Sequence, residues 1–316
     1  MLTWLLVNVW GYVLARLMFA FTLGNSGLMM ATLAERAPPR RIAFALSTMN
    51  SAILFGAFLG PLVGGPIIDR WGFQTLWLID TLVLFVGLLA MAFGYRDTFI
   101  DTDRGPILTM AIDSVFIITR SPRLRWLFPA LFLMYAGTMI TFTYVPLIAA
   151  QLYRGAEAAT GVGIVLGASG FVTMVLSPYV GALADRFRHR RVFLITALVE
   201  IVLWCLPMLT TDFTVFTILW AIIYGVSSSV FALSFTLLSQ SAASDVRGRV
   251  MSFAYLPVNI GGILGPLVGS LLIPISLFAI FPAAAMFTVL GVGMFVIAMR
   301  QAMTPLQAQA TASVGT

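Results

Sequence analysis

Three ionisable residues, Arg16, Asp80 and Glu200, each lie inside a long apolar segment of the sequence. Exclusion of water favours the neutral form of a carboxyl group, so a membrane-embedded Asp or Glu can act as a proton site. A mid-helix Arg costs at least about 2.5–3.5 kcal/mol on membrane-insertion scales. These residues are therefore candidates for transport or coupling, although Arg16 also lies close enough to a helix end to extend its side chain to the membrane surface.

The sequence lacks the residues that several common kinds of catalysis require. The 18 basic residues are all Arg, and without Lys there is neither a Walker A phosphate loop nor a Schiff base. His189 is the single histidine, which argues against a metal site and against a Ser-His hydrolase. Cys205 is the single cysteine and is expected to be a packing residue. We therefore expect no catalytic residues, no metal and no cofactor, and a protein that is not an enzyme.

The elements that must position these residues are membrane helices. Hydrophobic residues make up 60% of the chain and charged residues 9%, with a mean hydropathy of +1.00. Soluble domains carry about 25% charged residues, so the sequence predicts an all-α integral membrane protein. We predict nine crossing helices, near 9–34, 42–68, 73–95, 126–150, 159–184, 191–211, 214–239, 249–274 and 277–299.

The arginines indicate the orientation of these helices. Fifteen lie in one alternating set of connections, whereas the other set holds only Arg70 and Arg154. The positive-inside rule places the richer set and the C-terminus in the cytoplasm, which predicts a multi-pass protein of the cytoplasmic (inner) membrane. The net charge of +6 is then explained by topology, without a nucleic-acid partner.

A repeated hexapeptide divides the chain into two halves. Leu-Gly-Pro-Leu-Val-Gly occurs at 59–64 and returns at 264–269, an offset of 205 residues. At this offset the last three helices match the first three, but the three helices from 126 to 211 have no upstream counterpart. We expect two pseudo-symmetric halves with the first three of twelve helices missing, through truncation or a misplaced start. The alternative is a natural nine-helix variant.

This division predicts four regions. They are a three-helix remainder of an N-terminal bundle (1–96), a cytoplasmic linker with an interfacial helix (97–125), a six-helix C-terminal bundle (126–300) and a disordered tail (301–316).

Four motifs resemble the major facilitator superfamily over essentially the whole chain. Ser121 to Trp126 resembles the entry into its seventh helix, and Arg16 with the Pro39-Arg40-Arg41 turn resembles its fourth-helix pattern. The glycines and proline after Ser47 resemble the family's antiporter motif, and the loop after the 159–184 helix resembles its signature loop. The antiporter-like residues are Gly56, Gly60, Pro61, Gly64 and Gly65, and the loop residues are Gly181, Asp185, Arg186 and Arg190.

The resemblance implies a role for each motif. The Gly-Pro segment would pack the two halves together. Asp185 would accept hydrogen bonds from helix amides or from arginines of the other half in one conformation only, as a gate; the alternative is a solvated, positive-inside charge run. Arg16 would face the central cavity, whereas Glu200 and Asp80 would lie on helices outside it.

Polar and aromatic side chains at helical spacing indicate where the cavity lies. One stripe comprises Tyr135, Thr138 and Phe142, and the other comprises Trp220, Tyr224, Ser227 and Phe231. Large aromatics with few charges suit a bulky, apolar or cationic substrate. Such stripes also occur in plain helix packing.

The resulting prediction is a monomeric secondary transporter that exports a drug-like molecule or metabolite by alternating access, driven by protons. Its partners are the small-molecule substrate, protons and the lipid bilayer. Two alternatives stay open at this point: a sugar or metabolite uptake permease, and a truncated membrane partner or sensor that does not transport.

Overall fold

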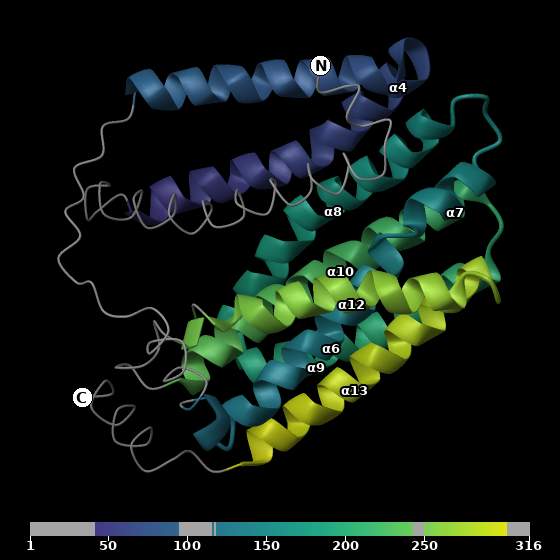
Figure 1. Cartoon of the computed structure of the whole chain (residues 1–316). Coiled ribbons are helices and arrows are strands. Elements are labelled where there is room, and N and C mark those ends of the chain that lie inside the picture. Colours follow the sequence, from purple (N-terminus) through teal and green to yellow (C-terminus); the bar gives the residue numbers. More distant parts are fainter. Residues whose placement is uncertain (1–41, 95–115, 117, 243–249, 252, 302–316) are drawn as a thin grey trace.

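The computed structural model describes residues 42–94, 116, 118–242, 250–251 and 253–301, and all structural statements concern these residues (Figure 1). Their regular structure is helical, and seven segments are long and apolar enough to cross a membrane. The predicted all-α membrane bundle is therefore confirmed. The helix predicted at 9–34, most of the 97–125 linker and nearly all of the tail lie outside the described residues.

The first described element, α4 (Ile42–Gly94), consists of two helical arms that meet at Gly72. Gly72 has φ +80° and ψ 166°, a backbone conformation that a residue with a Cβ atom rarely adopts. The arms fold back beside each other as a hairpin (Figure 1). The helices predicted at 42–68 and 73–95 are thus both present, with Gly72 at the bend.

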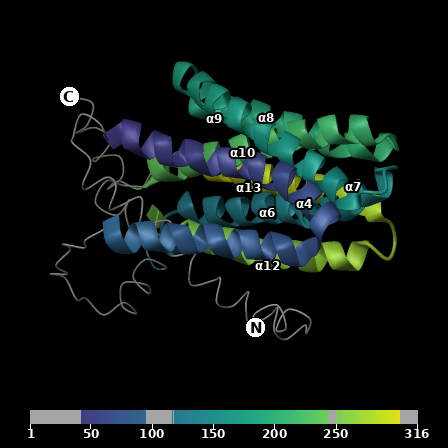
Figure 2. The ribbon, with the colours of Figure 1, turned by 90° about the horizontal axis from the view of Figure 1, so that it is seen from above.

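The second half of the described chain forms a helical bundle (Figures 1 and 2). Its helices agree with the six predicted ones within several residues, with one exception described below. They are α6 (Leu124–Phe142), α7 (Val145–Leu152), α8 (Ala158–Arg186), α9 (His189–Cys205), α10 (Phe213–Ser241), α12 (Tyr255–Leu272) and α13 (Ile280–Arg300). Short 3-10 turns cover Leu206–Leu209 and Leu277–Ala279.

The exception is the helix predicted at 126–150, which is divided into α6 and α7. The chain leaves the helix at Thr143 and Tyr144, and Pro146 occupies the first turn of α7. Because proline has no N–H and its ring collides with the carbonyl four residues earlier, an uninterrupted helix through Phe142 is disfavoured. Proline at the start of a new helix avoids both problems.

Glycines allow α12 and α13 to approach the backbone of α6 closely. A Cβ atom on Gly265 of α12 would lie 2.7 Å from the carbonyl oxygen of Ala136. One on Gly291 of α13 would lie 3.1 Å from the carbonyl oxygen of Ala130. Close approach of this kind is how membrane helices gain packing energy without a hydrophobic driving force. α6 is thereby held between its two neighbours.

The two copies of the repeated hexapeptide pack against different helices. The second copy, on α12, faces α6 through Gly265, whereas the first copy, on α4, faces α8. A Cβ atom on Gly65 would lie 2.5 Å from the carbonyl oxygen of Ala159, and Gly163 of α8 lies against the carbonyl of Pro61. Pro61 and Gly65 of the expected packing motif therefore form an interface between the first half and the second.

The other glycines of that motif lie elsewhere. Gly64 is buried and faces Leu76 in the second arm of its own hairpin, at 3.6 Å from a Cβ position. Gly56 and Gly60 have no described atom within 4 Å of a Cβ position.

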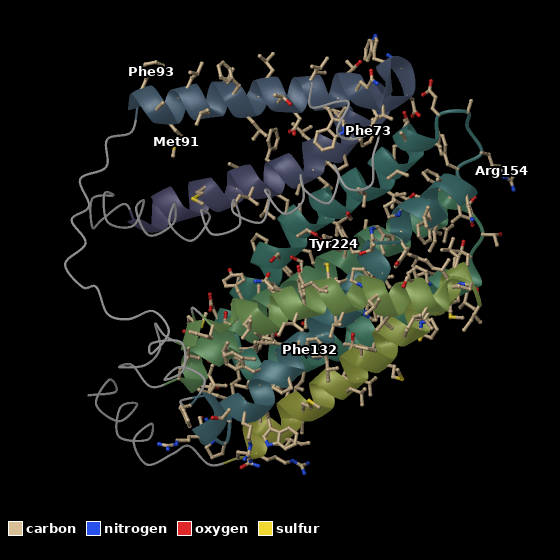
Figure 3. The ribbon with its side chains drawn as sticks, in the orientation of Figure 1. Phe73, Met91, Phe93, Phe132, Arg154 and Tyr224 are labelled. Carbon is tan, nitrogen blue, oxygen red and sulfur yellow. The ribbon has the colours of Figure 1, made fainter. Side chains whose placement is uncertain are left out.

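The second arm of α4 exposes its large apolar side chains. Phe93 is 85% exposed, and Phe93 and Met91 project on opposite sides of the arm (Figure 3). A contiguous exposed apolar surface of this kind is typical of helices that contact lipid.

Candidate functional site

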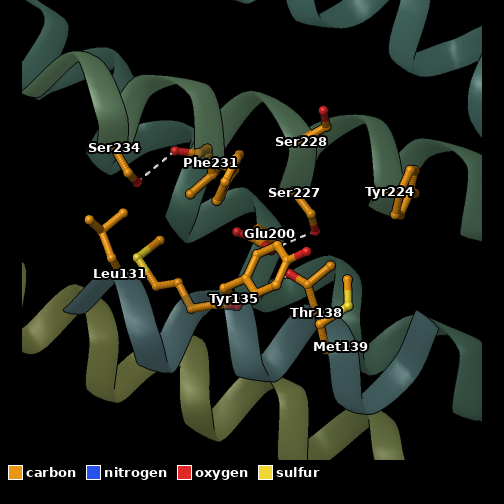
Figure 4. Close-up of a pocket in the computed structure, with 12 residues that line it drawn as sticks. Leu131, Tyr135, Thr138, Met139, Glu200, Tyr224, Ser227, Ser228, Phe231 and Ser234 are labelled. Atoms are coloured by element: carbon orange, nitrogen blue, oxygen red, sulfur yellow. Dashed lines mark hydrogen bonds between the residues drawn. The ribbon is translucent and has the colours of Figure 1, made fainter. Parts of the chain in front are cut away.

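A cavity of about 260 Å³ lies between α6, α9 and α10 (Figure 4). We call it the Glu200 cavity, because Glu200 is the ionisable acid among its lining residues. The lining is otherwise made of hydroxyl, aromatic, thioether and aliphatic groups. The lining residues are Leu131, Met134, Tyr135, Thr138, Met139, Glu200, Tyr224, Ser227, Ser228, Val230, Phe231 and Ser234.

Glu200 is the chemically distinctive member of this set. Its side chain is 2% exposed, and one carboxyl oxygen accepts a hydrogen bond of 2.6 Å from the Ser227 hydroxyl (Figure 4). The other carboxyl oxygen, Oε2, has no hydrogen-bond partner among the described residues. A buried carboxyl group with an oxygen that makes no hydrogen bond can hold a proton or, when ionised, bind a cation.

The helices that bring these groups together lie far apart in the sequence. Glu200 lies in the second half of α9, and Ser227 lies near the middle of α10, 27 residues later. Nearby hydroxyls are held by backbone acceptors of their own helices: Ser234 donates to the Val230 carbonyl at 2.7 Å and Thr138 to the Met134 carbonyl at 3.2 Å. The Ser227 hydroxyl, in contrast, donates its hydrogen bond to Glu200 on the neighbouring helix.

Aromatic side chains form the walls of the Glu200 cavity. The rings of Tyr135 and Phe231 contact each other in this wall, with their centres 5.3 Å apart and a tilt of 42°. The Tyr224 ring stacks on Phe142 at 5.2 Å and lies 5.8 Å from Trp220. A ring wall beside a carboxyl group is suited to a flat, apolar or cationic ligand.

Five of the seven residues of the two predicted stripes are in its lining: Tyr135, Thr138, Tyr224, Ser227 and Phe231. Phe142 and Trp220 instead lie behind the wall, and Trp220 is fully buried against Tyr224. Met134, Met139, Ser228 and Ser234 also line the cavity and are not part of the two predicted stripes. These side chains lie one helical turn from named ones, so the same periodicity could have found them.

Glu200 lies in the cavity wall, although the family resemblance placed its helix outside the cavity. The reason is that α9 packs on α10 and turns Glu200 toward Ser227. The other two ionisable candidates are not brought to this site. Asp80 is exposed on the second arm of α4, and Arg16 lies outside the described residues.

The loop between α8 and α9 lies at one end of the bundle. Asp185 is 79% exposed, and one of its carboxyl oxygens lies 3.2 Å from Nε2 of His189, four residues later. The guanidinium of Arg186 lies 5.9 Å from the ring centre of Phe187, and Gly181 has no described atom within 4 Å of a Cβ position. In the part of the chain that is described, this loop makes its polar contacts within itself.

Arg190 lies near a second arginine at the same end. Burial and the neighbouring charge of Arg190 lower the pKa of the Arg123 guanidinium from its ordinary value. The Arg123 Nε atom donates a hydrogen bond of 2.9 Å to the carbonyl of Gln301, which follows the last turn of α13. A cation is favoured there because carbonyls at a helix C-terminus lack partners. The described residues contain no group of three or more metal-ligating side chains.

Comparisons with known proteins agree with the motifs and the helices. The family model described as Major Facilitator Superfamily matches residues 1–159 and 127–313. The multidrug resistance protein MdtG of Klebsiella pneumoniae (strain 342) is 27% identical over 269 residues, which cover 83% of this chain and 64% of MdtG. The MdtG proteins of Salmonella paratyphi A (strain ATCC 9150 / SARB42) and Salmonella typhi are 25% identical over 272 residues, which cover 83% of this chain and 65% of each relative. The chain thus spans less than two thirds of these relatives.

Proposed function

The chain belongs to the Major Facilitator Superfamily, and from this premise we propose that it is a proton-coupled secondary transporter that exports a drug-like small molecule. Its relatives are named for multidrug resistance, which supports export over uptake. The observation that carries the proposal is the Glu200 cavity: a buried carboxyl group, one oxygen of which has no hydrogen-bond partner among the described residues, in a ring-lined space between membrane helices.

Glu200 couples the proton to the substrate. A protonated Glu200 is neutral and stable in its buried position, whereas an ionised Glu200 needs hydrogen-bond donors or a countercharge. The Ser227 hydroxyl supplies one donor, and the Trp204 indole N–H lies close to the same carboxyl group. A bound ligand supplies a further contact once movement of the helices exposes the buried Oε2 atom. Ligand and proton therefore occupy the same carboxyl group in turn, as an antiporter requires.

Movement of the two halves exposes the cavity to one side of the bilayer at a time. The α4–α8 interface, through Pro61 and Gly65, joins the halves, and the loop residues Gly181, Asp185, Arg186 and Arg190 act as the gate at the cytoplasmic end. The protein lies in the cytoplasmic membrane with its C-terminus inside. Energy comes from the proton gradient, since the chain has no Lys for a Walker A loop.

The experiment is dye transport into proteoliposomes with an imposed pH gradient. The chain and its Glu200→Gln variant are compared, because glutamine keeps the shape but cannot release a proton. Glu157→Gln is the matched control: Glu157 is exposed, and its side chain does not cap α8. We expect gradient-driven dye movement and dye-induced proton release for the chain and for Glu157→Gln, with at least about a hundredfold loss of proton release for Glu200→Gln.

Three outcomes would contradict the proposal. Gradient-driven transport that is unaffected by Glu200→Gln would remove Glu200 from coupling. Accumulation of sugars in place of dye would favour an uptake permease, and the absence of any transport by the well-folded chain would favour a non-transporting partner.

A further inference from the structure

A carboxylate of the first half holds the start of a helix of the second half. Asp69 lies one turn before the bend of α4, and its side chain reaches the first turn of α8. Its Oδ1 atom accepts a hydrogen bond from the Ala159 amide at 3.2 Å, and its Oδ2 atom accepts one from the Thr160 amide at 2.5 Å. Both amides belong to the first turn, where a helix offers no internal acceptor.

Local capping does not require this arrangement. Most helices take their N-terminal cap from the residue that precedes them. α10 does so here, since Asp212 accepts from the Val215 amide at 2.9 Å. The corresponding residue of α8 is Glu157, whose side chain makes no capping bond. The sequence repeat does not require Asp69 either, because its counterpart at the offset of 205 is Pro274.

The backbones of α4 and α8 meet directly beside this contact. Gly65 of α4 faces the Ala159 carbonyl, and Gly163 and Gly170 of α8 face the carbonyls of Pro61 and Ala57. In Figure 1 the first arm of α4 and α8 come together toward the bend of α4 and spread apart toward their other ends. Asp69 therefore lies at the end where the two halves are closest.

The contact depends on the halves staying in register. A hydrogen bond weakens steeply when its atoms separate by more than a few tenths of an ångström beyond 3.2 Å, so a small rotation of α4 away from α8 breaks both bonds. At the opposite end of α8, Asp185 is exposed and lies beside His189 of its own loop. At its start, α8 is bonded to a carboxylate of the first half. At its other end, the described residues show no such bond to the first half.

We propose that Asp69 is a gate residue: its carboxylate fastens the start of α8 in the conformation described here and must release it when that end of the transporter opens. This inference rests on the alternating exposure proposed above but not on Glu200 or on proton coupling. The negative carboxylate is matched to the positive end of the α8 helix dipole, and the Thr160 side chain lies beside it.

The test measures distances between the two halves without a transport assay. In a Cys205→Ser background of the full chain in liposomes, spin labels are placed at one end on Arg70→Cys and Arg154→Cys. A second pair at the other end uses Ser51→Cys and Arg188→Cys; all four positions are exposed. Double electron–electron resonance then gives the distance distribution for each pair.

We expect Asp69→Ala to raise the population of the longer distance at the Arg70–Arg154 pair by about threefold or more, with the opposite change at the other pair. Asp69→Asn, which keeps an acceptor but loses the charge, gives a smaller shift in the same direction. Ala159→Pro removes one donor from the α8 side at a position that tolerates proline, and reproduces the shift with Asp69 intact.

The matched control is Asp212→Ala, which removes the same kind of cap within one half and should leave both distributions unchanged. Helix content by circular dichroism and a single gel-filtration peak show that each variant is folded. Unchanged distances in Asp69→Ala and Ala159→Pro would overturn the gate role, and so would an equal shift in Asp212→Ala. If Asp69→Ala changes the distances as expected but the unsubstituted chain does not transport dye, only the proposed export function is contradicted.

Discussion

Replacing Gly170 with alanine tests the direct backbone contact between α4 and α8. A Cβ atom at this position would lie 2.7 Å from the Ala57 carbonyl oxygen, 2.8 Å from the Ala57 carbonyl carbon and 2.8 Å from the Phe58 Cα atom. Ordinary carbon–oxygen approaches are about 3.3–3.6 Å. The helices must therefore separate by roughly 0.6–0.9 Å at this point to admit one methyl group. No side-chain rotation can absorb the change, because all three atoms belong to the backbone.

Two opposing effects determine how much Gly170→Ala changes the free energy of unfolding. Alanine is favoured over glycine within a helix by about 1 kcal/mol. Overpacking a well-packed interior costs about 1–3 kcal/mol. Gly181→Ala on the same helix serves as the control, because no described atom lies within 4 Å of its Cβ position and only the favourable effect applies. We expect Gly170→Ala to be less stable than Gly181→Ala by about 1–3 kcal/mol.

The assay is reversible unfolding of the purified chain in mixed micelles, followed by circular dichroism as the denaturing detergent is increased. The difference between the two alanine variants isolates the interface from helix propensity. If their free energies of unfolding agree within about 0.5 kcal/mol, close to the scatter of surface substitutions, the backbone contact between α4 and α8 is not present in the membrane protein.

Two further predictions concern the bend and the cavity. Gly72→Ala should lower the free energy of unfolding by about 1–3 kcal/mol in the same assay, because the φ of +80° strains any residue with a Cβ atom; a neutral effect would mean that α4 is not bent there. Tyr224→Ala should weaken dye binding by about threefold to tenfold in a fluorescence titration, through loss of the ring wall that it shares with Phe142. Tyr224→Phe keeps the ring and should bind normally, and an equal loss in both variants would assign the effect to the hydroxyl.

The helices could be predicted from the sequence because the bilayer imposes their length and polarity. The apolar segments predicted α8, α10 and α13, and the predicted ends lie within a few residues of the observed ones. The division between α6 and α7 was missed, because proline is common inside membrane helices: Pro129 and Pro178 lie within α6 and α8 without ending them. Whether a proline ends a helix depends on the neighbours that satisfy the freed carbonyl.

The cavity could be predicted in part. Helical spacing placed Tyr135 with Thr138 and Tyr224 with Ser227 on common faces, and these faces do meet in the Glu200 cavity. Spacing within one helix does not indicate which neighbouring helix that face contacts. The position of Glu200 follows from the packing of α9 on α10, and that of Asp69 from the packing of α4 on α8; neither can be read from a single segment. The role predicted for Arg16 stays a prediction, since it lies outside the described residues.

The bond between Glu200 and Ser227 has a consequence for biosynthesis. An acidic residue at the centre of a helix costs about 3 kcal/mol during insertion by the translocon. The hydroxyl that satisfies Glu200 emerges from the ribosome 27 residues later, which is a delay of a few seconds at about 5–20 residues per second. The segment that contains α9 is strongly apolar, with a mean hydropathy of 2.4, so it can enter the lipid before α10, but Glu200 then lacks the Ser227 hydroxyl. A nascent chain halted before Ser227 should therefore release α9 to alkali more readily than one halted after α10.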